Sequence, residues 1–174
     1  MKRIAIIGSS GSGKSTLARS IGKILHIEVY HLDQLFWKPG WVLATLEEQK
    51  RIQHEITSQE HWIIDGTYSS TMDIRLKHAD TIIFLDLPRL LCVYRVVKRR
   101  IHYRNRTRPD MGEDCEEKLD WEFLSYVWNF PKTNKPKIEN YLLHRRANQE
   151  VIVLSSLKEI RIFLDKIRKT VQNR

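Results

Sequence analysis

The chain of 174 residues lacks several features that mark large classes of proteins. It has two cysteines, Cys92 and Cys115, whose spacing matches no metal-ligand pattern, so we interpret both as reduced thiols. No apolar stretch is long enough to span a bilayer, and the apolar run near the N-terminus is too short for a signal peptide. There is also no internal repeat and no low-complexity tract. These absences predict a cytoplasmic protein without a membrane partner.

Positive charge dominates a composition that is otherwise typical of a folded domain. Hydrophobic residues account for 41% and charged residues for 29% of the chain, and its length suits one domain over residues 1–174. The net charge of +9 introduces nucleic acid as a candidate partner. However, the basic residues concentrate between residues 95 and 108 and again between 161 and 174. We interpret the first group as a phosphate clamp and the second as a solvated helix face, so nucleic acid is possible but not required.

The most informative segment is the P-loop pattern G-x-x-x-x-G-K-S, which directly follows the apolar run of residues 4–7. Its glycines allow positive φ and a close approach of the backbone, so that successive N–H groups converge on a polyphosphate. The helical pattern that follows adds the positive end of a helix dipole. Lys14 suits the β- and γ-phosphates, and Ser15 offers a hydroxyl to Mg²⁺. The predicted nucleotide-binding residues are Gly8, Ser9, Ser10, Gly11, Ser12, Gly13, Lys14, Ser15 and Thr16.

Apolar runs alternate with helical patterns along the whole chain, which predicts an α/β fold of three layers with a five-stranded parallel sheet between helices. We expect the strands at residues 4–7, 27–32, 62–64, 81–85 and 151–154. Ligands of such folds bind outside the carboxyl ends of the strands. After the P-loop, the residues at those ends are Asp33, Asp65, Gly66, Asp86, Ser155 and Ser156.

Helical patterns and one irregular stretch fill the rest of the chain. Helices are expected after the capping-box pattern that begins at Thr45, at residues 90–101, at 119–130 and at 133–145. Trp121, Leu124 and Trp128 share one helix face, which is typical of a core stripe. Residues 37–41 are expected to form a loop. Residues 102–118 combine polar residues, proline and glycine, which predicts a mobile lid inserted in the domain.

Two strand-end carboxylates are candidates for the chemistry. Asp33 would orient or deprotonate an acceptor hydroxyl, or hold Mg²⁺ through water, and its alternative role is to cap a turn. Asp65 would position Mg²⁺ beside Ser15, and its alternative is that Asp-Gly merely suits the turn. We interpret Asp86 as structural. His31 is interpreted as a buried structural histidine rather than as a catalyst.

A cluster of arginines follows the fourth predicted strand: Arg95, Arg99, Arg104, Arg106 and Arg108. Guanidinium groups that close from a lid stabilise the charge that phosphoryl transfer spreads over the equatorial oxygens. We expect Arg104 and Arg108 to act in this way, and Arg95 and Arg99 to bind the nucleotide from one helix face. The alternative is an exposed basic helix and loop.

Side chains with flat or forked ends are candidates for binding the acceptor. Trp37 and Trp41 flank a proline and a glycine, and would wall the acceptor pocket or form a satellite hydrophobic cluster. Arg75 would grip an anionic part of the acceptor, or play a simple surface role. The predicted acceptor-binding residues are Asp33, Trp37, Trp41, Asp65, Tyr68 and Arg75.

Several of these segments together resemble the adenylate-kinase-like P-loop proteins of the DNA topology modulation, or FlaR-related, family. The resemblance covers nearly the whole chain, at residues 8–16 (GSSGSGKST), 31–41 (HLDQLFWKPGW), 62–68 (WIIDGTY), 81–88 (TIIFLDLP) and 119–132 (LDWEFLSYVWNFPK), and in the arginine-rich lid. It implies a nucleoside-kinase-like fold whose lid closes over ATP, with adenine between Arg95 or Arg99 and residues 155–158. No helix-turn-helix, zinc finger or other DNA-reading motif is present in the sequence.

The chain is also similar to shikimate and gluconate kinases, in which an Asp at the end of the second strand approaches the acceptor hydroxyl, and Asp33 is the matching position. It differs from shikimate kinases in having His31 where another carboxylate would stand. It differs from adenylate kinases in lacking the D-G-F-P-R run after residue 64. We therefore expect a phosphotransferase that moves the γ-phosphate of Mg-ATP, or of GTP, to a small acceptor. The alternative is a nucleotide-dependent DNA-binding or DNA-topology regulatory protein.

Overall fold

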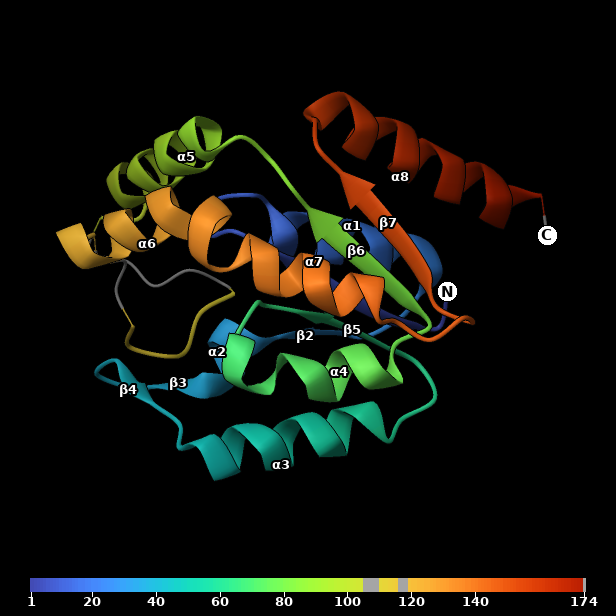
Figure 1. Ribbon diagram of the computed structural model, residues 1–174, viewed down its shortest axis with the longest axis horizontal. Helices are drawn as coiled ribbons and strands as arrows, with labels where there is room; N and C mark the ends of the chain where they lie inside the picture. The colour runs from blue at the N-terminus through green and yellow to red at the C-terminus, as the bar shows by residue number, and fades with distance from the viewer. Residues whose placement is uncertain (105–109, 116–118, 174) are drawn as a thin grey trace.

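A parallel sheet forms the centre of the computed structural model, which describes residues 1–104, 110–115 and 119–173 (Figure 1). Its five strands lie in the order β2-β5-β1-β6-β7. Their bounds are β1 Arg3–Gly8, β2 Val29–His31, β5 Trp62–Asp65, β6 Thr81–Leu85 and β7 Glu150–Leu154. All four pairings are parallel, so the carboxyl ends of the strands meet at one edge, and the predicted α/β sheet is confirmed.

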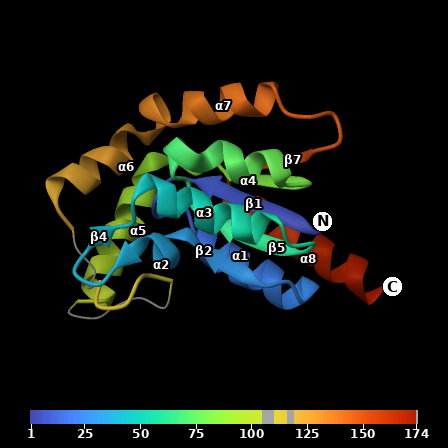
Figure 2. The same cartoon turned by 90° about the horizontal axis from the view of Figure 1, so that it is seen from below.

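Helices cover both faces of the sheet (Figure 2). One face packs against α1 (Lys14–Leu25) and α8 (Leu157–Gln172), and Ile4 and Ile6 of β1 point toward them. The other face packs against α3 (Leu46–Thr57), α4 (Met72–His78), α7 (Lys135–Leu143) and the end of α6 (Trp121–Thr133). Ala5 and Ile7 point to that second face because side chains alternate along a strand.

Helix α5 (Arg89–His102) packs against α6 beside the sheet, and their contact buries Cys92, Val96 and Val127. The expected core stripe on α6 is wrong, because Trp121 is 85% and Trp128 41% exposed. α5 lies over the neighbouring face of α6, and burial therefore falls on Val127 and Phe130 instead.

Two short elements follow β2 where the sequence predicted the end of a longer strand and then a loop. The chain turns into helix α2 (Leu32–Phe36) directly after His31, which places Asp33 in the first helical turn. Next, β3 (Trp37–Lys38) and β4 (Val42–Leu43) form a small antiparallel hairpin. Its turn contains Gly40 and Trp41 at positive φ of 76° and 64°. The remaining short element is the 3₁₀ helix Ser69–Thr71 before α4.

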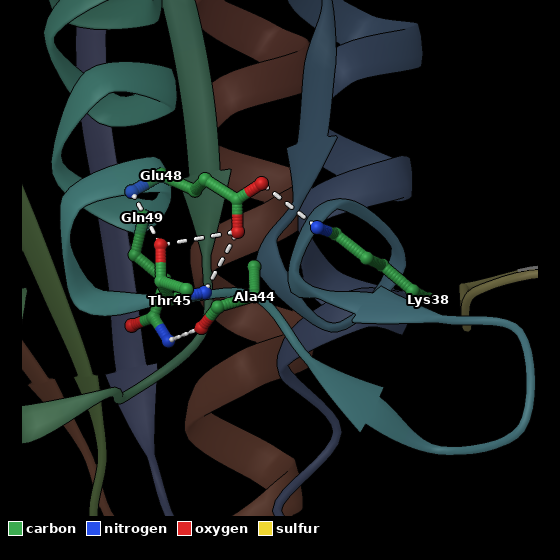
Figure 3. Close-up of polar contacts among 5 residues, drawn as sticks. All are labelled: Lys38, Ala44, Thr45, Glu48 and Gln49. Atoms are coloured by element: carbon green, nitrogen blue, oxygen red, sulfur yellow. Dashed lines mark hydrogen bonds and ion pairs between the residues drawn. The ribbon is translucent and has the colours of Figure 1, made fainter.

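The predicted capping box at the start of α3 is confirmed (Figure 3). The Thr45 hydroxyl accepts from the Glu48 amide at 3.2 Å, and the Glu48 carboxylate accepts from the Thr45 amide at 2.8 Å. Lys38 of β3 donates to the same carboxylate at 2.8 Å. This Lys38 hydrogen bond, followed by those from Thr45, lowers the pKa of Glu48 to about 2. The hairpin is thereby tied to the first turn of α3.

Asp80 ties the start of the central strand to the turn before β6. Its carboxylate accepts from the amides of Lys2 and Arg3, both at 2.9 Å, and from the Thr81 hydroxyl at 2.7 Å. Burial acts to raise the pKa of Asp80, but these hydrogen bonds outweigh burial and hold the pKa below its ordinary value.

The lowered pKa predicts an acid-dependent contribution of Asp80 to stability. The unfolded carboxyl titrates near pH ~3.9, so this contribution is present above that pH and is lost as the pH falls through the lower folded pKa. We expect Asp80→Asn to lower the free energy of unfolding at pH 7 and to flatten its decline below pH ~4. Urea unfolding from pH 7 to 2.5 measures both effects, with Asp165→Asn on exposed α8 as the control. Parallel pH curves for Asp80→Asn and the unmutated protein would contradict this assignment.

None of the helices in the described ranges combines the length and the apolar character that a membrane crossing requires.

Candidate functional site

The P-loop connects β1 to α1 at the carboxyl edge of the sheet. Gly8, Gly11 and Gly13 have positive φ of 147°, 80° and 97°. At two of these positions the neighbours also exclude a side chain. A Cβ at Gly8 would lie 2.6 Å from the Leu85 carbonyl oxygen, and one at Gly11 would lie 2.3 Å from that of Cys92. The glycines thus permit both the phosphate-binding conformation and the packing of the loop against β6 and α5.

Groups inside the loop fit a polyphosphate. The Ser12 hydroxyl is fully buried and has no hydrogen-bond partner among the described residues. Lys14 folds back over the loop and donates to the Ser9 carbonyl at 3.0 Å. Burial lowers the pKa of Lys14, while the negative charges of Asp33 and Asp65 oppose that shift. An anion at this position would add an opposite charge beside this partly buried ammonium group.

Ser15, Asp65 and His31 form a chain of side chains beside the loop. Ser15 Oγ donates to Asp65 Oδ2 at 2.8 Å, and Asp65 Oδ1 pairs with His31 Nδ1 at 2.5 Å. Parallel pairing of β2 with β5 places His31 directly beside Asp65. Because the Ser15 proton is directed to Asp65, lone pairs of its oxygen remain for a cation. In the part of the chain that the structure describes, no group of three or more His, Cys, Asp or Glu could hold a metal. Bound Mg²⁺ would therefore depend on phosphate and water oxygens as well.

Asp33 and Tyr68 lie together across from the P-loop. The Tyr68 hydroxyl donates to Asp33 Oδ1 at 2.8 Å, and its ring packs edge-on against Phe36 at a centroid distance of 4.8 Å. Burial, reinforced by the charge of Asp33, raises the pKa of Tyr68, so the phenol stays protonated and donates. Tyr68 thereby fixes one carboxylate oxygen of Asp33.

A cavity of about 590 Å³ joins the P-loop to these residues. Trp37 and Trp41, whose rings meet edge-on at a centroid distance of 5.3 Å, form part of its wall. The lining comprises Gly8, Ser10, Lys14, Asp33, Trp37, Trp41, Gly66, Thr67, Tyr68, Arg99, Met111, Asp120, Glu122, Phe123 and Tyr126. This volume is typical of a small-molecule site.

The arginines of the predicted clamp occupy different positions. Arg95 donates to the carbonyls of Gly11 and Ser12 at 3.4 and 3.2 Å, so it supports the P-loop from behind. Arg99 lines the cavity, and its charge contributes to the lowered pKa of Lys14. Arg104 is exposed just past the end of α5. Arg106 and Arg108 lie outside the described residues.

The Arg75 side chain has no exposed surface with which it could contact an acceptor. It is 0% exposed, and its guanidinium donates to Gln53 Oε1 at 2.9 Å and to the carbonyls of Gly66 and Thr71 at 2.8 and 3.3 Å. Burial lowers the pKa of Arg75 to about 10. The expected grip on an anionic acceptor and the alternative surface role are therefore both wrong: Arg75 is buried and instead holds the carbonyl of Gly66, which lines the cavity.

Residues 110–115, within the predicted lid, pack against the β3–β4 hairpin. A Cβ at Gly112 would lie 1.9 Å from the Trp37 carbonyl oxygen. The Cys115 thiol donates to the Lys38 carbonyl at 3.2 Å, and Met111 is buried and lines the cavity. This part of the predicted lid thus closes one side of the site.

The structure also adds cavity residues that the sequence analysis did not select. Thr67 ties the P-loop to β5, since its hydroxyl donates to the Gly8 carbonyl at 2.6 Å and accepts from the Gly8 amide at 3.1 Å. The sequence signal that could have identified Thr67 is its position just after the strand that ends at Asp65. The other additions are Met111, Asp120, Glu122, Phe123 and Tyr126, while Gly66 is one of the strand-end residues that the sequence indicated. No local pattern marked the start of α6 as a cavity wall.

Similarity of the amino-acid sequence to known proteins is weak. No protein-family model matches the chain. "Uncharacterized protein YqaC" of Bacillus subtilis (strain 168) is 28% identical over 128 residues, which cover 71% of this chain and 72% of that protein.

Solved structures of kinases are similar over nearly the whole chain. Shikimate kinase from Acinetobacter baumannii in complex with shikimate has a TM-score of 0.62 at 14% identity, covering 99% of this chain and 94% of that one. Shikimate kinase from Bacteroides thetaiotaomicron has a TM-score of 0.58 at 16% identity, covering 98% of both chains. A gluconokinase from Sinorhizobium meliloti 1021 has a TM-score of 0.51 at 15% identity, covering 99% and 94%. At these identities the similarity shows the P-loop kinase fold, and not a substrate.

Proposed function

We propose that this protein is an ATP-dependent phosphotransferase that transfers the γ-phosphate of Mg·ATP to a hydroxyl of a small acceptor. The observation that carries this proposal is the shared cavity. Lys14 of the P-loop and the carboxylate of Asp33 line the same space of about 590 Å³. A phosphate-binding loop and a candidate proton acceptor are thereby brought within one small-molecule site.

Each residue then has a role that follows from its contacts. The loop amides and Lys14 would bind the triphosphate, and Ser15 with Asp65 would hold Mg²⁺, Asp65 through water. Bound Mg²⁺ supplies neutralisation of phosphate charge. Asp33, held by the Tyr68 hydroxyl, would accept the proton of the attacking acceptor hydroxyl.

Arginines would complete the nucleotide side of the site. Arg99 lies in the cavity wall and would contact the phosphates, while Arg95 supports the loop that binds them. Arg104 and Arg108 of the predicted lid are proposed to stabilise the charge of the transferred phosphoryl group. GTP in place of ATP would use the same phosphate contacts.

A second candidate, a nucleotide-dependent DNA-binding or DNA-topology regulatory protein, draws on the basic charge. Arg161, Lys166, Arg168 and Lys169 are all exposed along α8. Binding through such residues would weaken steeply as salt rises, with a log–log slope of about −0.9 per phosphate contacted. Fluorescence anisotropy with duplex DNA between 50 and 200 mM salt, with and without Mg·ATP, distinguishes this candidate from a kinase.

The proposed nucleotide site predicts strong ligand protection. At Mg·ATP concentrations of 100 times Kd, the unmutated protein should gain about 2.7 kcal/mol of stability, because ligand binds only the folded state. Lys14→Ala should lose this gain, since the P-loop then lacks its cation. Thermal melting with Mg·ATP and Mg·GTP measures the effect, and Lys23→Ala, an exposed change on the same helix, is the matched control. Equal protection of Lys14→Ala and Lys23→Ala, or no protection of the unmutated protein, would overturn the proposed function.

A further inference from the structure

His31 and Asp65 lie side by side at the ends of neighbouring strands, because the parallel pairing of β2 with β5 sets them opposite each other. Two residues earlier on the same strands, Val29 and Ile63 pack against α1. Side chains alternate along a strand, so His31 and Asp65 point to that same face, where the first turn of α1 presents Ser15. The fold therefore brings the three polar side chains together at the base of the P-loop.

Two different groups hold the two oxygens of the Asp65 carboxylate. Oδ2 accepts from the Ser15 hydroxyl at 2.8 Å, and Oδ1 pairs with His31 Nδ1. An ionised carboxylate can only accept, so Nδ1 carries the proton of this pair. A single hydrogen bond would leave the carboxylate free to turn about its last side-chain bond, whereas bonds on both oxygens fix its plane. His31 thereby determines how Asp65 faces Ser15.

Burial increases the importance of this hydrogen bond. The side chains of His31 and Asp65 are 10% and 4% exposed. A carboxylate in such a place depends on protein donors for the stabilisation that water would otherwise give its charge. The charge of Asp65 also reaches the phosphate-binding side, where it opposes the lowering of the Lys14 pKa by burial. An ionised and fixed Asp65 is therefore important to both the cation and the phosphate side of the site.

Resting on the proposed function, we propose that His31 is a positioning residue: its Nδ1–H holds Asp65 in the orientation in which that carboxylate, together with Ser15, supports Mg²⁺. His31 would act through Asp65, as the hydrogen-bond partners of metal-binding side chains do. Replacing such partners weakens metal binding or activity about 10- to 100-fold. A purely structural histidine would instead contribute to stability and leave metal binding unchanged.

Two substitutions of similar shape isolate the donor. His31→Asn keeps an N–H close to the position of Nδ1, whereas His31→Leu fills similar space without one. Calorimetry with a non-hydrolysable ATP analogue, in Mg²⁺ and then in EDTA, gives the gain in affinity that the metal provides. We expect His31→Leu to reduce this gain about tenfold or more with the affinity in EDTA unchanged, and His31→Asn to keep most of it. His54→Leu, the same change at the exposed end of α3, is the matched control.

A double-mutant cycle tests whether His31 acts through Asp65. Asp65→Asn should itself reduce the gain that Mg²⁺ provides. In that background His31→Leu should cause little further loss, because the carboxylate that His31 positions is already gone. Losses that simply add would overturn the inference. Equal losses in His31→Leu and His31→Asn, or a full gain in His31→Leu, would overturn it too.

NMR of the unmutated protein with ¹⁵N-labelled histidine gives a readout that does not depend on whether His31→Leu folds. We expect the Nδ1 of His31 to carry the proton, and its resonance to shift when Mg²⁺ joins the complex of protein and analogue. The resonances of His54 should stay in place, and His31→Asn identifies the His31 signal. An unprotonated Nδ1, or a His31 signal that Mg²⁺ leaves unchanged, would overturn the inference.

The outcomes separate this inference from the proposed function. A protein that binds the analogue more tightly in Mg²⁺ than in EDTA, and does so equally well as His31→Leu, keeps the proposed function and loses the role of His31. A protein that binds the analogue in neither condition is not an ATP-dependent phosphotransferase, and the inference fails with the proposed function.

Discussion

Replacing Asp33 with asparagine is expected to slow phosphoryl transfer to the acceptor by about 10²- to 10⁴-fold, which is the usual contribution of a positioned proton acceptor. Asparagine has nearly the same shape and keeps an oxygen that can accept from the Tyr68 hydroxyl, now 2.8 Å from the carboxylate. It cannot take a proton from the acceptor. The loss should therefore fall on kcat, with Mg·ATP binding unchanged.

Steady-state kinetics measures the expected loss of kcat, and melting curves with Mg·ATP measure whether nucleotide binding is unchanged. Asp165→Asn, the same chemical change on exposed α8, should leave both unchanged. Tyr68→Phe keeps the carboxylate but removes the hydroxyl that orients it, so a smaller loss of about tenfold or less is expected. An Asp33→Asn variant with full turnover would exclude Asp33 as the proton acceptor. One that no longer binds Mg·ATP would instead assign Asp33 to nucleotide binding.

Replacing Arg75 with alanine is expected to lower the free energy of unfolding by about 3 kcal/mol, because Gln53 Oε1 and the Gly66 carbonyl would lose the guanidinium donors that they accept from inside the protein. Removing the fully buried side chain also leaves a cavity. The release of a buried charge offsets part of this loss.

Two further variants separate the causes of the Arg75 effect. Arg75→Met restores much of the lost volume without the donors, so it should recover only the cavity part. Arg75→Lys should remain destabilised, because an ammonium group lacks the planar fork that reaches Gln53 and Gly66 together. Urea unfolding followed by tryptophan fluorescence gives these values. Arg51→Ala, on the exposed face of α3, should change stability by less than about 0.5 kcal/mol. An Arg75→Ala variant as stable as this control would contradict a stabilising role for the buried Arg75 hydrogen bonds.

Much of the fold follows from short-range patterns in the sequence. The alternation of apolar runs with helical periodicity predicted the parallel sheet, and Thr45 with Glu48 predicted the start of α3. These features could be predicted because side-chain period and cap chemistry act within a few residues. Residues 37–41 were predicted as a loop but belong to a β-hairpin. The sequence did not reveal the hairpin because it depends on contacts with residues 110–115 and with Glu48.

The candidate site divides in the same way. By itself, the sequence determined the P-loop conformation, because positive-φ glycines and a following helix are local requirements that can be read from residues 8–15. Only the tertiary structure decided which distant side chains come together: His31 pairs with Asp65, Tyr68 bonds to Asp33, and Phe123 and Tyr126 of α6 line the same cavity as the hairpin tryptophans. It also decided that Arg75 is buried, since exposure depends on the packing of α3, α4 and the turn after β5 together. Such pairings depend on how separate elements pack, and no local pattern records that.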